Sequence, residues 1–212
     1  MKKIIFALAM MLLSSSGWAA SEQYTNAMKG LLQKMGDAKS PEAYQAAANG
    51  FERIANNEKS EWLPAYYASF CYIMQAMSIQ DKDKIDGIVD HAETLLETAS
   101  TIQSNDEILC LQSLCKSARI NVNPMARGMK YGPQAAELIA KAKTMNPNNP
   151  RVYYLEGQSK FYTPEAFGGG KDKAKVLFEK AVETYAAFKP SNELMPVWGA
   201  EQAKEMLEAC NK

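Results

Sequence analysis

The feature that most constrains the fold is a short helical signature that recurs along the chain. A small residue is followed four positions later by a larger apolar residue, and three positions after that by another small or apolar residue. The four copies are Ala47–Phe51–Ile54, Ala92–Leu96–Ala99, Ala135–Ile139–Ala142 and Ala174–Phe178–Ala181, and they start 45, 43 and 39 residues apart. Spacings of four and three place side chains on one stripe of a helix. The chain is therefore predicted to stack helical units, none of which buries its apolar face alone.

Each signature helix follows another stretch with helical character. The three clearest stretches span residues 61–78, 106–120 and 150–162, and Asn-Pro or Ser-Asn turns stop one pair before the next begins. Outer helices are expected near both ends, over residues 21–35 and 198–210. Few β-branched clusters alternate with polar residues, so the sequence predicts an all-α fold.

Two segments are predicted to lengthen the turns within helix pairs. The first is residues 121–132, which contain Pro124 and two glycines. The second is residues 163–170, which end in three glycines and in which Phe167 is expected to pack back and anchor the loop. These long turns explain why the repeats start 39 to 45 residues apart.

The junction at residues 146–150, Asn-Pro-Asn-Asn-Pro, together with Gly157 and the signature at residues 174–181, resembles the tetratricopeptide repeat (TPR) family. The resemblance covers about residues 40–190. It implies a TPR-like right-handed superhelix of about four antiparallel helix pairs with a C-terminal capping helix, whose concave face binds peptides or protein segments. The family period is about 34 residues, which is shorter than the period found here. The period alone fits HEAT-like repeats equally well, and the Asn-Pro junction decides for TPR.

The first 19 residues have the layout of a secretory signal peptide. Two lysines precede a ten-residue apolar run, and Gly17 and Ala19 supply small residues at the −3 and −1 positions. The run is too short to cross a bilayer, which needs about 20 residues. We expect cleavage after Ala19, with Ala20 as the alternative. Residues 20–212 are then one TPR-like helical domain that is periplasmic or secreted.

Composition and motifs exclude several function classes. The chain has 24 basic and 24 acidic side chains, so it lacks the positive charge expected of a nucleic-acid binder. His91 is the only histidine, and no zinc-binding His-Glu-x-x-His or Gly-x-Ser-x-Gly nucleophile motif is present. Residues 168–171, Gly-Gly-Gly-Lys, lack the strand and the Ser or Thr of a phosphate-binding loop. We therefore predict a binding protein and not an enzyme, with no catalytic residue, cofactor or metal.

The four cysteines, Cys71, Cys110, Cys115 and Cys210, leave the redox state open. A disulfide is compatible with export. Cys110 and Cys115 lie about 7.5 Å apart along one predicted helix axis and point in different directions. Cys71 with either of them, across neighbouring helices, is the better pairing. The alternative is that all four are small, reduced, buried side chains.

Laying the TPR pattern over the aromatic helices gives a set of candidate partner-binding residues on the concave face. They are Tyr66, Phe70, Gln112, Lys116, Arg119, Tyr154, Gln158, Phe161 and Tyr162. Aromatic walls with a few amide and cationic groups suit an extended peptide or a small ligand with a carboxylate. The main prediction is an exported scaffold that binds a protein or peptide segment, with no nucleic acid and no membrane span. The alternatives are a small-molecule-binding periplasmic protein or enzyme accessory subunit that uses the same wall, and self-association.

Overall fold

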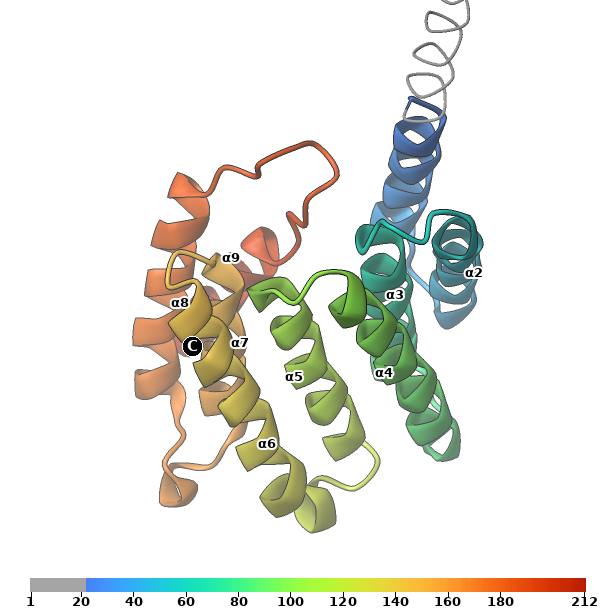
Figure 1. Ribbon diagram of the computed structural model, residues 1–212. Helices are drawn as coiled ribbons and strands as arrows, with labels where there is room; N and C mark the ends of the chain where they lie inside the picture. The colour runs from blue at the N-terminus through green and yellow to red at the C-terminus, as the bar shows by residue number, and fades with distance from the viewer. Residues whose placement is uncertain (1–21) are drawn as a thin grey trace, which may run out of the picture.

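The computed structural model describes residues 22–212 and contains only helices and the loops that join them (Figure 1). No strand occurs in this part of the chain, so the predicted all-α class is confirmed. No helix within the described residues is long and apolar enough to cross a membrane. The predicted signal peptide, residues 1–19, lies outside the described residues.

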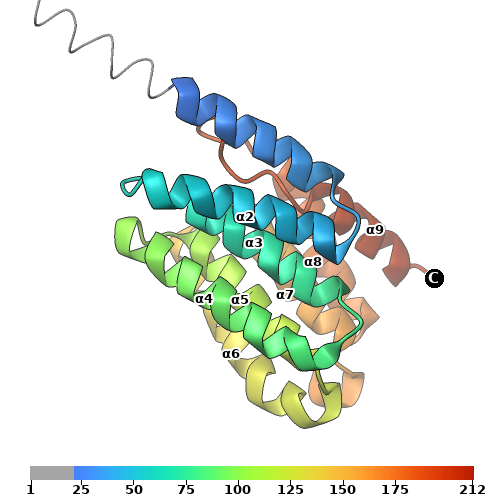
Figure 2. The same ribbon diagram turned by 90° about the vertical axis from the view of Figure 1, so that its right-hand side faces the viewer.

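The helices follow one another as antiparallel neighbours. They are a helix over residues 22–37, α2 (Pro41–Asn57), α3 (Leu63–Ser78), α4 (Ile85–Ile102), α5 (Asp106–Ile120), α6 (Pro124–Met145), α7 (Pro150–Tyr162), α8 (Lys171–Ala187) and α9 (Ala200–Cys210). Two short 3-10 turns, η1 (Lys82–Lys84) and η2 (Glu165–Phe167), precede α4 and α8. Sequential neighbours make the most extensive contacts. Figure 2 shows the N-terminal helix, α2, α3 and α4 as successive layers of this stack.

The recurring signature forms the centre of each helix pair, as predicted. Every signature residue is buried except Ile54, which is half-buried. Gly157 shows how closely the paired helices approach, because a Cβ at this position would lie 2.7 Å from Cε1 of Phe178. Only glycine allows α7 to pack this tightly against the large residue of the α8 signature.

The prediction of a long turn over residues 121–132 is wrong. The α6 helix begins at Pro124, and the Asn123 side chain accepts a hydrogen bond from the Ala126 amide at 3.1 Å. An asparagine cap followed by proline in the first turn is a strong helix start. Residues 124–132 contain no buried side chain, so this segment has no apolar stripe from which the helix could be recognised.

The loop over residues 163–170 is present as predicted, but Phe167 does not anchor it. The Phe167 side chain is 78% exposed. Backbone bonds hold the loop instead, because the Gly170 amide donates to the carbonyl oxygens of Lys160 (2.9 Å) and Thr163 (3.1 Å). Gly170 has a φ of 109°, a left-handed conformation that favours glycine.

All four cysteines are free. Cys71, Cys110 and Cys115 are buried, and Cys210 is half-buried. Burial raises the pKa of Cys71 to about 12, so its thiol is protonated and unreactive near neutral pH. This arrangement agrees with the alternative that the cysteines are reduced and form no disulfide.

Candidate ligand-binding face

A loop over residues 188–199, here called the strap, lies across one side of the helix stack. In Figure 1 it rises from α8, reaches toward the N-terminal helix and returns to α9. The side that it covers, here called the inner face, carries Tyr66 of α3, Glu107 of α5 and Arg151 of α7. Of these three residues, Tyr66 is one of those predicted for the concave face.

Hydrogen bonds and an ion pair fix the strap at several points. Tyr67 Oη donates to the carbonyl oxygen of Leu194 at 2.6 Å in a buried position. Near the end of the strap, Trp198 Nε1 donates to Tyr66 Oη at 2.8 Å. At the surface, Lys29 Nζ lies 2.7 Å from a Glu193 carboxylate oxygen. The chain therefore covers part of its inner face with its own residues.

A buried ion pair lies beneath the strap. Arg151 is fully buried, and its Nε and Nη2 donate to the two carboxylate oxygens of Glu107 at 2.6–2.9 Å. Burial acts to lower the pKa of Arg151, but the Glu107 charge outweighs it and the pKa rises. Burial raises the pKa of Glu107, and Arg151 opposes that shift. The guanidinium therefore stays charged, and its plane is fixed by a two-point contact.

The Asn-Pro junction seen in the sequence supports this ion pair. Asn149 Nδ2 donates to Asp106 Oδ2 and to Glu107 Oε1, each at 2.7 Å. Its Oδ1 accepts from the Arg151 amide at 2.9 Å and so caps α7. The same asparagine therefore begins α7 and holds the first carboxylates of α5.

An aromatic cluster continues from the strap along α7. The Trp198 ring lies 5.2 Å from Phe70 and 6.5 Å from Tyr154, measured between ring centroids. Gln158 Nε2 donates to Tyr154 Oη at 2.8 Å, and one helical turn further on Tyr162 is 72% exposed. We call Phe70, Tyr154, Gln158, Tyr162 and Trp198 the aromatic face. Burial, aided by nearby Tyr162, raises the pKa of Tyr154, so this buried phenol is uncharged near neutral pH.

The structure brings together some of the predicted site residues at this cluster. Tyr66 is fully buried beneath Trp198, to which it is hydrogen bonded, while Phe70 and Tyr154 flank the indole ring. Phe161 is half-buried, with its ring centroid 6.5 Å from that of Phe178.

The predicted cationic residues lie elsewhere. Lys116 Nζ is 2.7 Å from Glu93 Oε1, and Arg119 contacts the carboxylates of α4, with its Nη2 2.7 Å from Glu93 Oε2. Gln112, on the same helix, is half-buried. The two cations are thus engaged with α4 and do not join the aromatic face.

Sequence reasoning missed Trp198 as a member of this site. The sequence predicts a last helix that starts at this tryptophan, but the helix begins at Ala200. The usable signal was a tryptophan between Pro196 and Gly199, in a segment without helical periodicity. A large aromatic residue in such a segment needs a tertiary contact to be stable.

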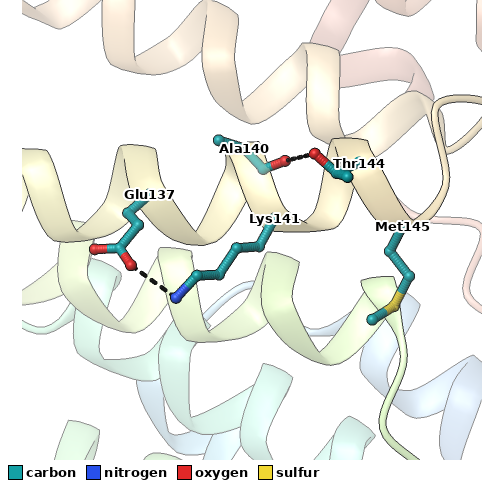
Figure 3. Close-up of a pocket in the computed structure, with 5 residues that line it drawn as sticks. All are labelled: Glu137, Ala140, Lys141, Thr144 and Met145. Carbon is teal, nitrogen blue, oxygen red and sulfur yellow. Dashed lines mark hydrogen bonds and ion pairs between the residues drawn. The ribbon is translucent and has the colours of Figure 1, made fainter.

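Two other hollows on the surface are weaker candidates for a ligand site. An open groove of about 520 Å³ between α2, α3 and α4 contains His91, whose Nε2 lies 3.0 Å from Glu52 Oε1. The shallow hollow in Figure 3 lies on the surface of α6, where Glu137 and Lys141 form an ion pair of 2.7 Å. All of its lining residues come from this one helix, so it cannot enclose a ligand. Among residues 22–212, no group of three or more His, Cys, Asp or Glu side chains could hold a metal ion.

Comparison with solved structures gives an informative likeness. The chain is similar to the solved structure of the HusA haemophore from Porphyromonas gingivalis, with a TM-score of 0.81 and 39% sequence identity over 88% of this chain and 92% of that chain. No protein-family model matches the chain, and no curated protein does.

This likeness overturns the main functional prediction. A haemophore is a haem carrier, so the relative points to a small-molecule ligand and not to a protein segment. The prediction of a peptide-binding scaffold is therefore wrong, and the alternative of small-molecule binding is better supported. The inner face fits this correction, because the chain's own strap is hydrogen bonded across it.

Proposed function

Because the chain belongs to the same family as the HusA haemophore of Porphyromonas gingivalis, we propose that it binds haem or a closely related tetrapyrrole. The observation that carries the proposal is the likeness to a haemophore over nearly the whole length of both chains. We propose a carrier that leaves its ligand chemically unchanged. This choice agrees with the sequence, which has no recognisable catalytic motif.

The aromatic face is the surface that suits such a ligand best. A tetrapyrrole is a flat, largely apolar ring system, and aromatic side chains bind flat rings by stacking and edge contacts. Tyr154 and Tyr162 are eight residues apart on α7, hence separated by about 12 Å along the helix axis. The half-buried Trp198 and the buried Phe70 continue the aromatic cluster beyond Tyr154, which is itself buried. The proposed site thus combines residues predicted from the sequence with one supplied by the strap.

Export and repeat type belong to the same proposal. We propose that residues 1–19 are a cleaved signal peptide, so that the mature chain acts in the periplasm or outside the cell. The charge layout and small residues of this segment support the assignment.

The TPR-like character of the helix pairs is also part of the proposal. It rests on the signature helices and the Asn-Pro junction, and it describes the scaffold and not the ligand.

Ligand titration of the mature chain tests the function and the site together. Haem and the corresponding iron-free porphyrin are added while their absorbance is followed. We expect saturable binding, and about a two- to twelve-fold loss of affinity in Tyr162→Ala, since one aromatic contact contributes about 0.5–1.5 kcal/mol. The matched control is Tyr153→Ala, which removes the neighbouring tyrosine that bonds to the carbonyl oxygen of Pro147 and should leave affinity unchanged.

The outcomes separate the two claims. If neither porphyrin binds the unaltered chain, the proposed function is wrong. If both variants bind as tightly as the unaltered chain, the function stands and the aromatic face is not the site. Binding of both porphyrins with similar affinity would show that ring contacts dominate, whereas a strong preference for haem would show that the iron is a major contact.

A further inference from the structure

One buried guanidinium contacts both ends of the strap. Phe188 begins the strap and Trp198 lies next to its end. Arg151 Cζ is 4.8 Å from the Phe188 ring centroid and 5.6 Å from the Trp198 ring centroid. Arg151 Nη1 is buried and has no hydrogen-bond partner within residues 22–212. The part of the guanidinium that Glu107 leaves free is therefore available to the two rings, where cation–π attraction is strong because water is excluded.

Glu107 fixes the orientation of this guanidinium. Its carboxylate engages Nε and Nη2 of Arg151 and is itself held by Asn149 Nδ2. A planar fork bound at two points cannot rotate without breaking both contacts. The guanidinium thereby fixes the rings of Phe188 and Trp198 relative to α5 and α7, the helices that carry Glu107 and Arg151.

The second contact of Trp198 leads back to the same carboxylate. Trp198 Nε1 donates to Tyr66 Oη at 2.8 Å, and Tyr66 Oη in turn donates to Glu107 Oε2 at 3.3 Å. The backbone is also constrained, because Tyr185 Oη donates to the Trp198 carbonyl oxygen at 2.9 Å. The next residue, Gly199, has a φ of 102°, and a Cβ there would lie 2.1 Å from Tyr185 Oη. The half-buried indole is therefore held on its ring face, at its N–H group and through its backbone.

From these contacts we infer that Arg151, held by Glu107, is a positioning residue that presents Trp198 to the ligand. This inference rests on the proposed tetrapyrrole site. Arg151 is fully buried, so it acts through the indole and does not touch the ligand itself. A purely structural ion pair would join α5 to α7 and leave the order of Trp198 unchanged, which gives the two roles different observable consequences.

The test uses Trp198 as its own reporter. In a Trp62→Phe background, Trp198 is the only tryptophan of residues 20–212. The double variant Glu107→Gln/Arg151→Met removes both charges together and avoids a lone buried charge. The control is Lys143→Met/Glu156→Gln, which removes an ion pair of 2.9 Å between α6 and α7 without changing either contact of Trp198. Tryptophan emission and acrylamide quenching are measured without ligand, and haem affinity is measured by titration.

We expect the double variant to stay helical by circular dichroism, to show red-shifted and more readily quenched Trp198 emission, and to bind haem about ten-fold more weakly. Lys143→Met/Glu156→Gln should keep the emission and affinity of its parent. A folded double variant with unchanged emission and affinity would overturn the inference.

Arg151→Lys covers the case in which the double variant does not fold. It keeps the charge but loses the planar fork and the stacking surface, so the same emission shift and loss of affinity are expected, and unchanged values would overturn the inference. Failure of the proposed function gives a different result. The unaltered chain would not bind haem, while an emission shift in the variants would still support Arg151 as the residue that orders Trp198.

Discussion

Two arginines of this protein bind carboxylates in contrasting surroundings. Arg151 is fully buried and binds a single carboxylate, that of Glu107. We call Arg151 and Glu107 the deep pair. Arg119 has a side chain that is 10% exposed and contacts three carboxylates of α4, which are 26–68% exposed. With Arg127, which also contacts Asp86, these residues form the rim cluster, whose members are Arg119, Arg127, Asp86, Asp90 and Glu93.

The contrast shows how similar chemistry serves different purposes in one fold. The deep pair organises the strap and the inner face, but removing two charges from water has a large cost that only complete hydrogen bonding offsets. The rim cluster links α4 to α5 and α6 at the surface, where water and salt screen each contact. The deep pair should therefore be sensitive to the loss of one member, and the rim cluster should tolerate it.

The largest expected effect comes from breaking the deep pair on one side. Glu107→Ala leaves the Arg151 guanidinium buried without its counter-charge, and we expect the free energy of unfolding to fall by about 3–5 kcal/mol. Urea unfolding followed by circular dichroism measures this loss. Glu93→Ala is the matched control on the rim and should cost less than about 1 kcal/mol. Similar losses in the two variants would mean that burial does not separate the clusters.

The helix pairs were predictable because their information is local. Signature spacings within seven residues place Ala135, Ile139 and Ala142 on one stripe, and the packed structure buries that stripe. Helix ends with strong caps, such as Asn149 before Pro150, were also visible in the sequence. The first turns of α6 were missed because residues 124–132 have no buried side.

The site was less predictable because its contacts are distant along the chain. Trp198 and Tyr66 are 132 residues apart, and Leu194 and Tyr67 are 127 apart. Nothing local in the strap encodes these partners. Arg119 illustrates a second limit. A template can assign a residue to a helix, but the rotation of α5 about its axis is set by packing, and here it turns Arg119 toward α4.

An intermediate effect is expected from removing the central cation of the rim cluster. Arg119→Ala deletes contacts of 2.6 Å to Asp90 and 2.7 Å to Glu93 and leaves the carboxylates of α4 facing one another. We expect the free energy of unfolding to fall by about 1–2 kcal/mol, because charge-assisted hydrogen bonds contribute less when their carboxylates are exposed to water. Urea unfolding at low salt and at about 1 M salt should show a smaller loss at high salt, because screening shortens to about 3 Å. A loss that does not depend on salt would assign the effect to packing of the arginine stem.

The smallest effect is a pH dependence carried by Asp86. Hydrogen bonds from Arg127 Nη1 and Nη2, of 2.7 and 2.8 Å, lower the pKa of this carboxyl, burial partly opposes them, and Arg119 adds to the lowering. A folded-state pKa below the unfolded value means that the unfolded chain binds the proton more tightly. The resulting stabilisation is complete above the ordinary pKa of an aspartate, about 3.9, and is lost as the pH falls through the lower, folded-state value.

Asp86→Asn tests this pH dependence. The Asp86 side chain is 40% exposed, so we expect the variant to be less stable near neutral pH by under about 1 kcal/mol. Urea midpoints measured from about pH 7 down to about pH 2 should converge with those of the unaltered chain at the acid end, since the protonated carboxyl and the amide are both uncharged. A constant difference across this range would show that Asp86 acts through hydrogen-bond geometry and not through charge. The deep pair would then be the main place in this comparison where charge itself shapes the fold.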